Sequence, residues 1–433
     1  MTINLFDGKS HAEPIGHDIM LGLKGFLDGV WSERPIFYEE DNHSGKGQPF
    51  LKFKDDYISA RNYVGFIQYR DLRINIYPRV FYNPDVFEPE RAIRHVLKWL
   101  GYSRRINFPA SDVDFEITAT DDWLESLIFL FSRLTKDLVN NAPHFTYEET
   151  MEEMSFVRGR IAIPEYIRHN LATGRLHAVH CLYEPFVYDN LFNRVIKYTT
   201  RLLLNFTREK RSEDLLREIL FTLDEVSDIS CTGTDCDKIR INRLYPEMEK
   251  VRSLCKMFLH HHDIQLPEGV NGNLCLLLPM EIIFEQYIAG FIETHFPEYR
   301  SQTQASGEYL AITKDKASIP VFRMKHDILL PDRLLIDTKY KFRYRDDTRN
   351  AGVDQGDMYQ MLAYCLRRNM KQGLLLYPAH QDVDAENNLQ AFEIVSTSYS
   401  TVIRAGSIDI TETIMQDFDK CQKEKFIQLI DIE

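Results

Sequence analysis

The feature that most constrains this chain is an apolar hairpin pattern that carries charges at fixed positions. Two runs of strand-forming residues, 327–330 and 334–336, flank a Pro331-Asp332 turn signal. Asp327 opens the first run, and the second leads directly into Asp337-Thr338-Lys339. Because side chains alternate across a strand, Asp337 and Lys339 point to the same face. A carboxylate and an ammonium on so apolar a strand cost free energy unless they are paired, bound to metal or used in chemistry.

The length and the charge of the chain narrow the class of protein around this hairpin. With 433 residues the chain is too long for one ordinary core, and two to three domains are expected. A content of 44% hydrophobic and 27% charged residues is that of a globular protein. The net charge of −13 excludes a protein that coats nucleic acid by bulk electrostatics. It leaves open a local basic groove, or delivery to DNA by a partner.

The cysteines and the hydropathy of the chain predict a reducing, non-membrane environment. The chain has 7 cysteines, and only Cys231 and Cys236 lie close together, with no second pair at the spacing of a zinc site. Free thiols are typical of the cytoplasm. The first residues lack the charged and apolar regions of a signal peptide, and no run reaches the roughly 20 apolar residues of a membrane helix. We expect a cytoplasmic protein with no membrane association.

Residues 1–90 predict a small β domain, which we expect to be a partner-docking module. Turn signals separate four short β-prone runs, and nothing in them indicates catalysis. In the last run, Ile74 and Ile76 alternate with polar residues up to Pro78, which predicts a half-buried strand. The four runs are 50–53, 57–60, 63–69 and 72–77.

Residues 91–265 predict a mainly helical domain that serves as a scaffold or linker. Apolar residues recur at helical spacing in four segments of this part of the chain. Within it, Phe156-Val-Arg-Gly-Arg160 fits a solvated turn better than a phosphate or partner contact, because arginines beside glycine are common in turns. The four helical segments are 93–101, 123–139, 189–209 and 212–222.

Residues 270–433 predict a compact α/β domain with a mixed sheet. The Pro- and Gly-containing loop 266–273 is the clearest domain boundary in the chain. After it, helical and strand patterns alternate in an order that suits one mixed sheet covered by helices. The expected helices are 280–291, 355–368 and 411–428, and the expected strands are 308–313, 320–330, 334–342, 373–377 and 392–396.

The charged hairpin has the composition of a metal-dependent phosphodiesterase site. If the two strands pair, Asp327 and Asp337 converge, and two carboxylates make a hard oxygen site suited to Mg²⁺ (or Mn²⁺). The backbone carbonyl of Thr338 is a third candidate ligand, and Lys339 is placed to position or polarise the attacking water. The alternative for Asp337 and Lys339 taken alone is an intrastrand ion pair on the surface.

Two further groups of polar residues extend this candidate site. Gln360 and Tyr364 lie four residues apart on one face of the helix 355–368, where they either contact a DNA backbone or brace Lys339. The alternative is that they form the polar face of an amphipathic helix. If the strand of Lys339 continues, Lys341, Arg343 and Arg345 share its face and form a basic track for DNA.

The motifs of the chain resemble those of the PD-(D/E)xK nuclease superfamily, and more narrowly those of the McrC family. The resemblance rests on Glu285 in Phe-Glu-Gln-Tyr287, on Asp327, on Leu335-Ile-Asp-Thr-Lys-Tyr-Lys341 and on Asp357-Met-Tyr-Gln-Met-Leu-Ala-Tyr364. Upstream segments also match, namely Ala60–Gly65, Ile74–Pro78, Phe156–Arg160 and Asp189–Arg194. One departure is that His326 stands where the superfamily name expects proline.

The resemblance implies a Mg²⁺-dependent DNA endonuclease subunit of a modification-dependent restriction system. It implies an α+β multidomain chain whose residues 270–433 form the PD-(D/E)xK domain, with Asp327 and Asp337 on the metal, Lys339 and Gln360 in catalysis and Glu285 adding a ligand or holding one in place. The implied partners are a McrB-like AAA+ GTPase hexamer, which the chain docks on and stimulates, and double-stranded, modified DNA. The alternative is a non-catalytic adaptor that activates an NTPase ring and uses a nuclease-like fold to clamp DNA.

Overall fold

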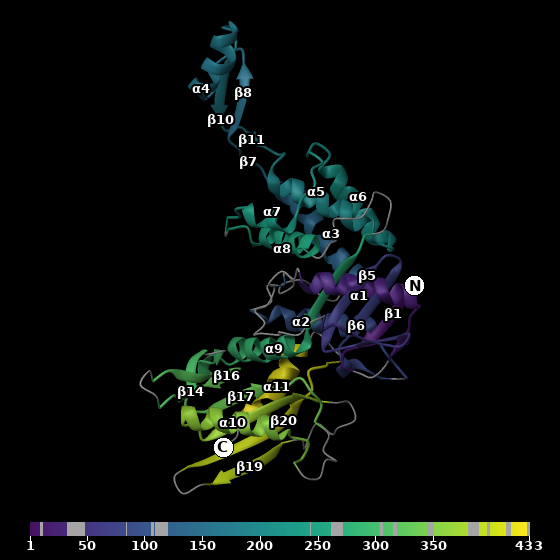
Figure 1. Cartoon of the computed structure of the whole chain (residues 1–433), viewed down its shortest axis with the longest axis vertical. Helices are drawn as coiled ribbons and strands as arrows, with labels where there is room; N and C mark the ends of the chain where they lie inside the picture. Colours follow the sequence, from purple (N-terminus) through teal and green to yellow (C-terminus); the bar gives the residue numbers. More distant parts are fainter. Residues whose placement is uncertain are drawn as a thin grey trace. The chain divides into compact units, whose positions relative to one another are not determined.

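The computed structural model shows a mixed α+β protein built from several sheets (Figure 1). Contacts divide the chain into two compact units, one of Met1–Trp123 with Gly272–Glu433 and the other of Leu124–Asn271. The structure describes residues 1–8, 12–32, 48–83, 85–104, 108, 120–242, 244–260, 272–303, 306–314, 318–343, 350–379, 389–395, 399–412 and 417–430.

In the first unit, the N-terminal segment and the C-terminal segment share a sheet. Its strand order is β1-β6-β5-β12, from Thr2–Phe6, Leu72–Tyr77, Tyr63–Tyr69 and Leu274–Pro279. The strand β12 pairs antiparallel with β5, so the chain returns to this sheet after some 200 residues. A smaller sheet, β2-β4-β3, is formed by Glu13–Pro14, Tyr57–Ala60 and Leu51–Lys54. The division into domains at 1–90, 91–265 and 270–433 stays a prediction.

The four strands predicted in this segment are confirmed as β3, β4, β5 and β6, but the expected half-burial of the last one is wrong. All residues of β6 are buried, because internal partners satisfy its polar side chains. Arg73 donates from Nε to Gln68 and forms an ion pair of 3.2 Å with Asp122. Asn75 lies beside the same aspartate. Helix α1 (His17–Ser32) also belongs to this core, through the buried Leu23 and Leu27.

The rest of the first unit is a six-stranded mixed sheet, as predicted for residues 270–433. The order is β13-β16-β17-β18-β20-β19, in which β17–β18 and β18–β20 are parallel and the other pairs antiparallel. The helices α9 and α10 both contact β17, α11 contacts β20, and α2 packs on α9. The strands are Gln302–Thr303, Ile328–Leu330, Leu334–Thr338, Gln372–Pro378, Ser400–Ile408 and Gln390–Val395, and the helices are α2 (Pro89–Gly101), α9 (Met280–His295), α10 (Gln355–Arg368) and α11 (Phe418–Ile430).

A hairpin of β14 (Ser306–Ile312) and β15 (Pro320–Lys325) leads into this sheet. The predicted loop 266–273 lies mostly outside the described residues, and the division between the two units falls at Asn271 and Gly272.

The second unit contains three of the four helical segments predicted for residues 91–265, whereas 93–101 is α2 of the first unit, and the second unit is not mainly helical throughout. Residues 146–187 form two small sheets, β8-β10-β9 and β11-β7. Figure 1 shows them together with the short helix α4, separate from the longer helices of this unit. Strand β8 reads Thr-Met-Glu-Glu-Met, a composition that favours helix, and pairing with β10 overrides it. The helices are α3 (Trp123–Asn141), α4 (Ile163–Glu165), α5 (Leu191–Leu204), α6 (Lys210–Thr222), α7 (Gly233–Lys238) and α8 (Pro246–His260), and the strands are Thr146–Tyr147, Thr150–Met154, Arg160–Ile161, Val179–Tyr183 and Phe186–Val187.

A helix that crosses a membrane must be long and apolar, which the helices of the described residues are not.

The contact between β5 and β12 gives a direct test of the shared sheet. Gly65 has a φ of +129°, and a Cβ at this position would lie 2.1 Å from the carbonyl oxygen of Leu276. We therefore expect Gly65→Ala to lower the free energy of unfolding by about 2–4 kcal/mol. Gly25→Ala on the exposed side of α1, where a Cβ meets nothing within 4 Å, should instead raise it by about 0.5–1 kcal/mol. Urea denaturation of both variants measures this, and equal stability of Gly65→Ala and the wild type would contradict the pairing.

Candidate active site

The charged hairpin forms with the register that brings its two aspartates together. In the pairing of β16 with β17, Ile328 faces Ile336 and Leu330 faces Leu334. Continuing this register by one residue places Asp327 opposite Asp337. The predicted turn is confirmed, with Asp332 at a φ of +58° and the Arg333 N–H donating to the Leu330 carbonyl at 3.1 Å.

Asp327 fixes the backbone at the end of β17. Its Oδ2 accepts a hydrogen bond of 2.7 Å from the backbone N–H of Thr338 and another of 2.7 Å from the Thr338 hydroxyl. Two donors on one oxygen hold the carboxylate in a single orientation, and its Oδ1 takes part in neither bond. Asp327, at the start of the hairpin, thus holds Thr338 in place, and Thr338 lies between Asp337 and Lys339.

Asp337 is a buried carboxylate whose ionisation the fold disfavours. Its side chain is 3% exposed and its Oδ2 lies 2.7 Å from Nζ of Lys339, which confirms the predicted placement of these two side chains on one face. Burial, followed by the charge of Asp327, raises the pKa of Asp337 to about 7, although the lysine opposes this shift. The surface ion pair considered from the sequence is wrong, because both partners lie mostly below the surface.

Lys339 is held from a second side by α10. Its Nζ donates to Oε1 of Gln360 at 3.1 Å, Nε2 of Gln360 donates to the Tyr364 hydroxyl at 2.7 Å, and that hydroxyl donates to the Lys325 carbonyl at 2.8 Å. Burial disfavours the charged lysine, but Asp337 and the neighbouring aspartates outweigh it and raise the pKa of Lys339. The ammonium therefore stays protonated at neutral pH. Of the two predicted roles for Gln360 and Tyr364, bracing Lys339 agrees with these contacts.

The basic track expected beyond Lys339 lacks its strand, because β17 ends at Thr338 rather than at residue 342. Lys341 instead forms an ion pair of 2.5 Å with Asp357. The side chain of Arg343 is buried in this structure, and Arg345 lies outside the described residues. The role of these three residues in DNA binding stays a prediction.

Asp357 is a residue of this site that sequence reasoning did not select. It lies in the first turn of α10, its charge acts on both Asp337 and Lys339, and the Tyr377 hydroxyl donates to it at 3.4 Å. Its position three residues before Gln360, on the same helical face, was the signal that could have found it. Glu285 is half-buried on α9, which contacts β17, and its predicted role is open to test.

The donor chemistry of the site fits a hard divalent cation. Asp327, Asp337 and the Thr338 carbonyl offer oxygen ligands only, the type that Mg²⁺ and Mn²⁺ take. Within the described residues no group of three or more His, Cys, Asp or Glu is arranged to hold a metal, so the protein carboxylates proposed here are the pair Asp327 and Asp337 alone. Magnesium keeps several waters and uses one or two carboxylates together with substrate phosphates, which suits such a set.

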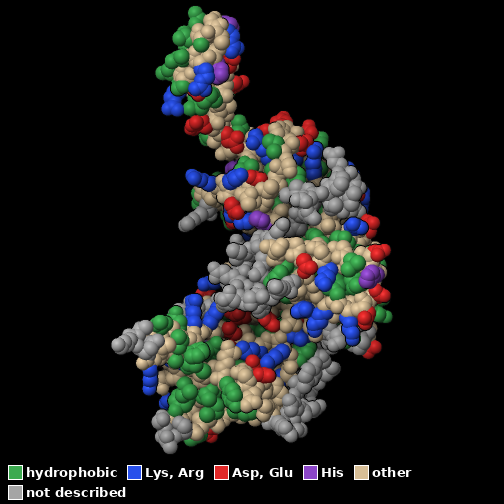
Figure 2. All heavy atoms as spheres, in the orientation of Figure 1, with side chains coloured by type: hydrophobic (Ala, Val, Ile, Leu, Met, Phe, Trp, Pro, Cys, Tyr) green, Lys and Arg blue, Asp and Glu red, His purple; other side chains and the backbone are tan. Residues whose placement is uncertain are grey.

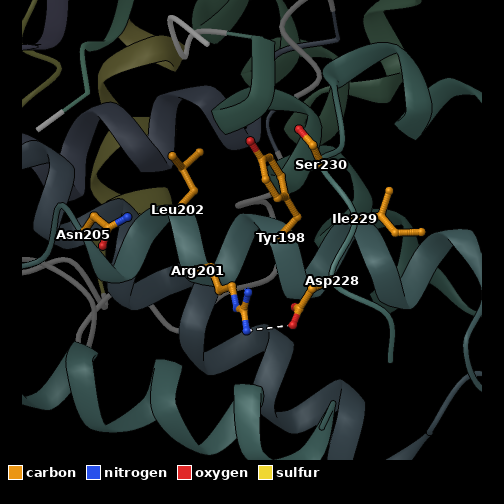
Figure 3. A pocket seen from close by; sticks show the side chains of 7 residues that line it. All are labelled: Tyr198, Arg201, Leu202, Asn205, Asp228, Ile229 and Ser230. Carbon is orange, nitrogen blue, oxygen red and sulfur yellow. Dashed lines mark ion pairs between the residues drawn. The ribbon is translucent and has the colours of Figure 1, made fainter. Parts of the chain in front are cut away.

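A pocket of about 250 Å³ lies in the second unit and holds none of the predicted site residues (Figure 3). Arg201 and Asp228 form an ion pair of 2.8 Å on its wall, which leaves neither charge free for a ligand. The lining residues are Tyr198, Arg201, Leu202, Asn205, Asp228, Ile229 and Ser230. The hairpin remains the better candidate for chemistry.

The raised pKa of Asp337 predicts how stability depends on pH in metal-free protein. Between its ordinary value of 3.8 and about 7, the folded state holds a proton that the unfolded state has lost. The stabilising contribution of this carboxyl is therefore complete below about pH 4 and is lost as the pH rises through 7. Because Asp337→Asn lacks this group, the free-energy difference between variant and wild type should shift in favour of the variant by roughly 1–4 kcal/mol from pH 4 to pH 7. Chemical denaturation at both pH values measures this shift. If the difference in unfolding free energy between variant and wild type is the same at pH 4 and pH 7, the pKa of Asp337 is not raised.

Comparison with known proteins gives a family for this chain and two similar solved structures. Residues 58–378 match the family described as McrBC 5-methylcytosine restriction system component. A solved structure of a half-complex from the tetradecameric assembly of Thermococcus gammatolerans McrB AAA+ hexamers with bound McrC is similar, with a TM-score of 0.74 and 16% identity over 99% of this chain and 100% of that one. A chain of the Thermococcus gammatolerans McrBC complex matches with a TM-score of 0.51 and 19% identity, over 67% of this chain and 87% of that one. The search of curated proteins gave no match.

The two structural likenesses show the fold, and the family match covers well over half of the chain. The resemblance drawn from the sequence motifs is thereby confirmed: this chain belongs to the McrBC 5-methylcytosine restriction system component family.

Proposed function

We propose that this chain is the DNA endonuclease subunit of a modification-dependent restriction complex, with a PD-(D/E)xK fold in residues 270–433. In the proposal it cuts phosphodiesters of modified double-stranded DNA with Mg²⁺ or Mn²⁺, docks on a McrB-like AAA+ GTPase hexamer and stimulates it in the cytoplasm. One observation carries the nuclease assignment: a buried carboxylate, Asp337, lies 2.7 Å from a lysine that a glutamine on α10 also holds. A buried carboxylate of this kind lowers the stability of the fold, so stability does not explain its presence, whereas a role in catalysis does.

The residues divide the chemistry between them. Asp327, Asp337 and the Thr338 carbonyl would hold Mg²⁺, which would neutralise the charge that develops on the scissile phosphate. Lys339 stays protonated, so it donates hydrogen bonds to the attacking water or to a phosphate oxygen rather than accepting a proton. Gln360 fixes the direction of that donor, and Tyr364 fixes Gln360. Glu285 on α9 adds a ligand or holds one in place.

The second candidate is an adaptor that activates an NTPase ring and only clamps DNA. A clamp needs cations that face the phosphates, whereas the two lysines that follow Asp337, Lys339 and Lys341, are each paired with an aspartate. The like-charged pair Asp327 and Asp337 would also weaken a clamp. We therefore prefer the nuclease.

The docking surface has two candidates. The sequence predicts docking through residues 1–90. The second is the segment 145–186 of the second unit, where 11 large apolar side chains are exposed, among them Phe156 and Ile163 at about 60% each. Figure 2 shows hydrophobic side chains gathered on this segment. Because soluble proteins rarely expose so many apolar residues together, the segment suits a protein partner, and the AAA+ hexamer is the occupant we propose.

The nuclease assignment predicts that single changes in the hairpin separate cutting from partner activation. Asp337→Ala should reduce Mg²⁺-dependent DNA cleavage, measured with partner and GTP, by about 100-fold or more. Lys339→Met should cause a similar loss. Both variants should stimulate GTP hydrolysis by the partner as the wild type does, because neither residue is exposed for docking. Cleavage by Asp337→Ala at the wild-type rate would retire the nuclease in favour of the adaptor.

The exposed apolar segment predicts the opposite separation. The double variant Phe156→Asp with Ile163→Asp should lower stimulation of the partner's GTP hydrolysis roughly 10-fold or more, since buried charges at an interface core are poorly tolerated. A matched control is Phe221→Asp on α6, which changes a side chain 85% exposed outside this segment. If the double variant stimulates as well as the control, docking through 145–186 is wrong and residues 1–90 remain.

A further inference from the structure

A buried charge network ties the N-terminal sheet to the strand that carries Lys339. The strands β1 and β6 are parallel neighbours in register up to Phe6 and Tyr77, so the residues that follow them come together. These are Asp7, whose side chain is fully buried, and Arg79. The backbone N–H of Arg79 donates to Oδ1 of Asp7, and Nε of Arg79 lies 3.8 Å from Oδ2 of Asp7.

The guanidinium of Arg79 reaches the segment that directly follows Lys339. Its Nη2 donates to the carbonyl oxygen of Tyr340, and its central carbon lies 4.7 Å from the centre of the Tyr340 ring and 5.2 Å from that of Phe342. The Tyr340 hydroxyl in turn donates to Oδ1 of Asp7 at 3.2 Å. One arginine thus binds the backbone and both aromatic side chains of residues 340–342.

Gly8 provides the space that the Arg79 side chain occupies, and its backbone has a left-handed conformation. Gly8 has a φ of +61°, and a Cβ there would lie 2.7 Å from Nη1 of Arg79. Only glycine combines that left-handed conformation with so close an approach. Asp7 and Gly8 thus both lie against Arg79, which in turn contacts the Tyr340 carbonyl.

The segment that receives this contact lies beyond the end of the sheet ladder, where the Tyr340 ring also packs on Phe284 and Lys341 pairs with Asp357. The sheet ladder ends with Thr338, and the Lys339 N–H still donates to the Leu376 carbonyl at 2.8 Å. Beyond that point the described segment has a local bond from the Lys341 N–H to the Lys339 carbonyl. The side chain of Lys339 must nevertheless point between Asp337 and Gln360. The bond from Arg79 to the next carbonyl holds the backbone that sets this direction.

We propose that Arg79, oriented by Asp7, is a positioning residue for Lys339, so that the N-terminal sheet supplies part of the nuclease site. The inference rests on the proposed nuclease function. Arg79 touches neither Asp327 nor Asp337 and acts only through residues 340–342. A buried ion pair adds little net stability compared with apolar packing, which favours a role in fixing geometry.

Arg73 provides a matched comparison. It lies on β6, six residues before Arg79, it is buried, and like Arg79 it pairs with an aspartate, in this case Asp122. Its hydrogen-bond partners Gln68 and Asp122 belong to the N-terminal part of the chain and not to residues 339–342. A change at Arg73 therefore tests the general cost of losing an arginine that is paired with an aspartate in this part of the chain.

The experiment compares Arg79→Met and Arg79→Lys with Arg73→Met and Arg73→Lys in the full-length chain. Single-turnover cleavage of modified DNA with partner, GTP and Mg²⁺ gives the rate per folded protein, and DNA affinity is measured separately with Ca²⁺. We expect Arg79→Met to cut about 100-fold more slowly at unchanged DNA affinity, because a small misplacement of a catalytic group has an effect of this size. Arg79→Lys keeps the charge beside Asp7 but loses the planar fork, and should cut about 10-fold more slowly. Both Arg73 variants should cut at the wild-type rate.

The possible outcomes distinguish failure of the Arg79 inference from failure of the proposed nuclease function. If Asp337→Ala is inactive while both folded Arg79 variants cut at the wild-type rate, the inference is overturned and the nuclease stands. If the Arg73 variants lose as much as the Arg79 variants, the effect is general and the inference is again overturned. If Asp337→Ala itself cuts normally, the proposed function fails first. Should Arg79→Met not fold, Arg79→Lys with its Arg73→Lys control decides alone.

Discussion

The site depends on one buried ion pair, that of Asp337 with Lys339. A carboxylate 3% exposed has lost nearly all of its hydration, and burial together with the charge of Asp327 raises its pKa to about 7. Much of the surrounding structure holds this pair in place. Asp327 accepts a hydrogen bond from Thr338, which lies between the two residues, and Gln360 of α10 accepts one from Lys339. The fold thus contains an electrostatically unfavourable buried carboxylate, a feature that is common in catalytic sites.

A second consequence concerns the chain as a whole. The strand β12 connects the hairpin domain to the N-terminal sheet, and all its residues are buried there. Arg79 adds a polar link from the same sheet to the backbone after Lys339. The first and the last parts of the chain therefore share one core.

Local patterns were enough to predict much of this. Alternation along 334–339 placed Asp337 and Lys339 on one face, the Pro331-Asp332 turn fixed the hairpin, and the spacing of Gln360 and Tyr364 put them on one side of a helix. Each of these inferences rests on residues within a few positions of one another. The motifs also identified the family correctly.

The remaining features depend on contacts between distant residues. The pairing of β12 with β5 joins positions some 200 apart, and Leu274–Pro279 reads like any apolar run before a helix. Strand β6 looked half-buried because the partners of Arg73 and Asn75 cannot be seen locally. The expected extension of the strand beyond Thr338 is wrong for a similar reason, because Lys341 forms an ion pair with Asp357 on α10.

Iron-directed cleavage of the protein backbone tests the central claim most directly, because it needs neither partner nor DNA. Fe²⁺ bound in place of Mg²⁺, with ascorbate and peroxide, cuts the chain next to the metal. The account predicts fragments that end near Asp327 and near Asp337–Lys339, suppressed by excess Mg²⁺ and absent from Asp337→Ala. Fragments that end elsewhere, or the same fragments from Asp337→Ala, would contradict a metal site in this hairpin.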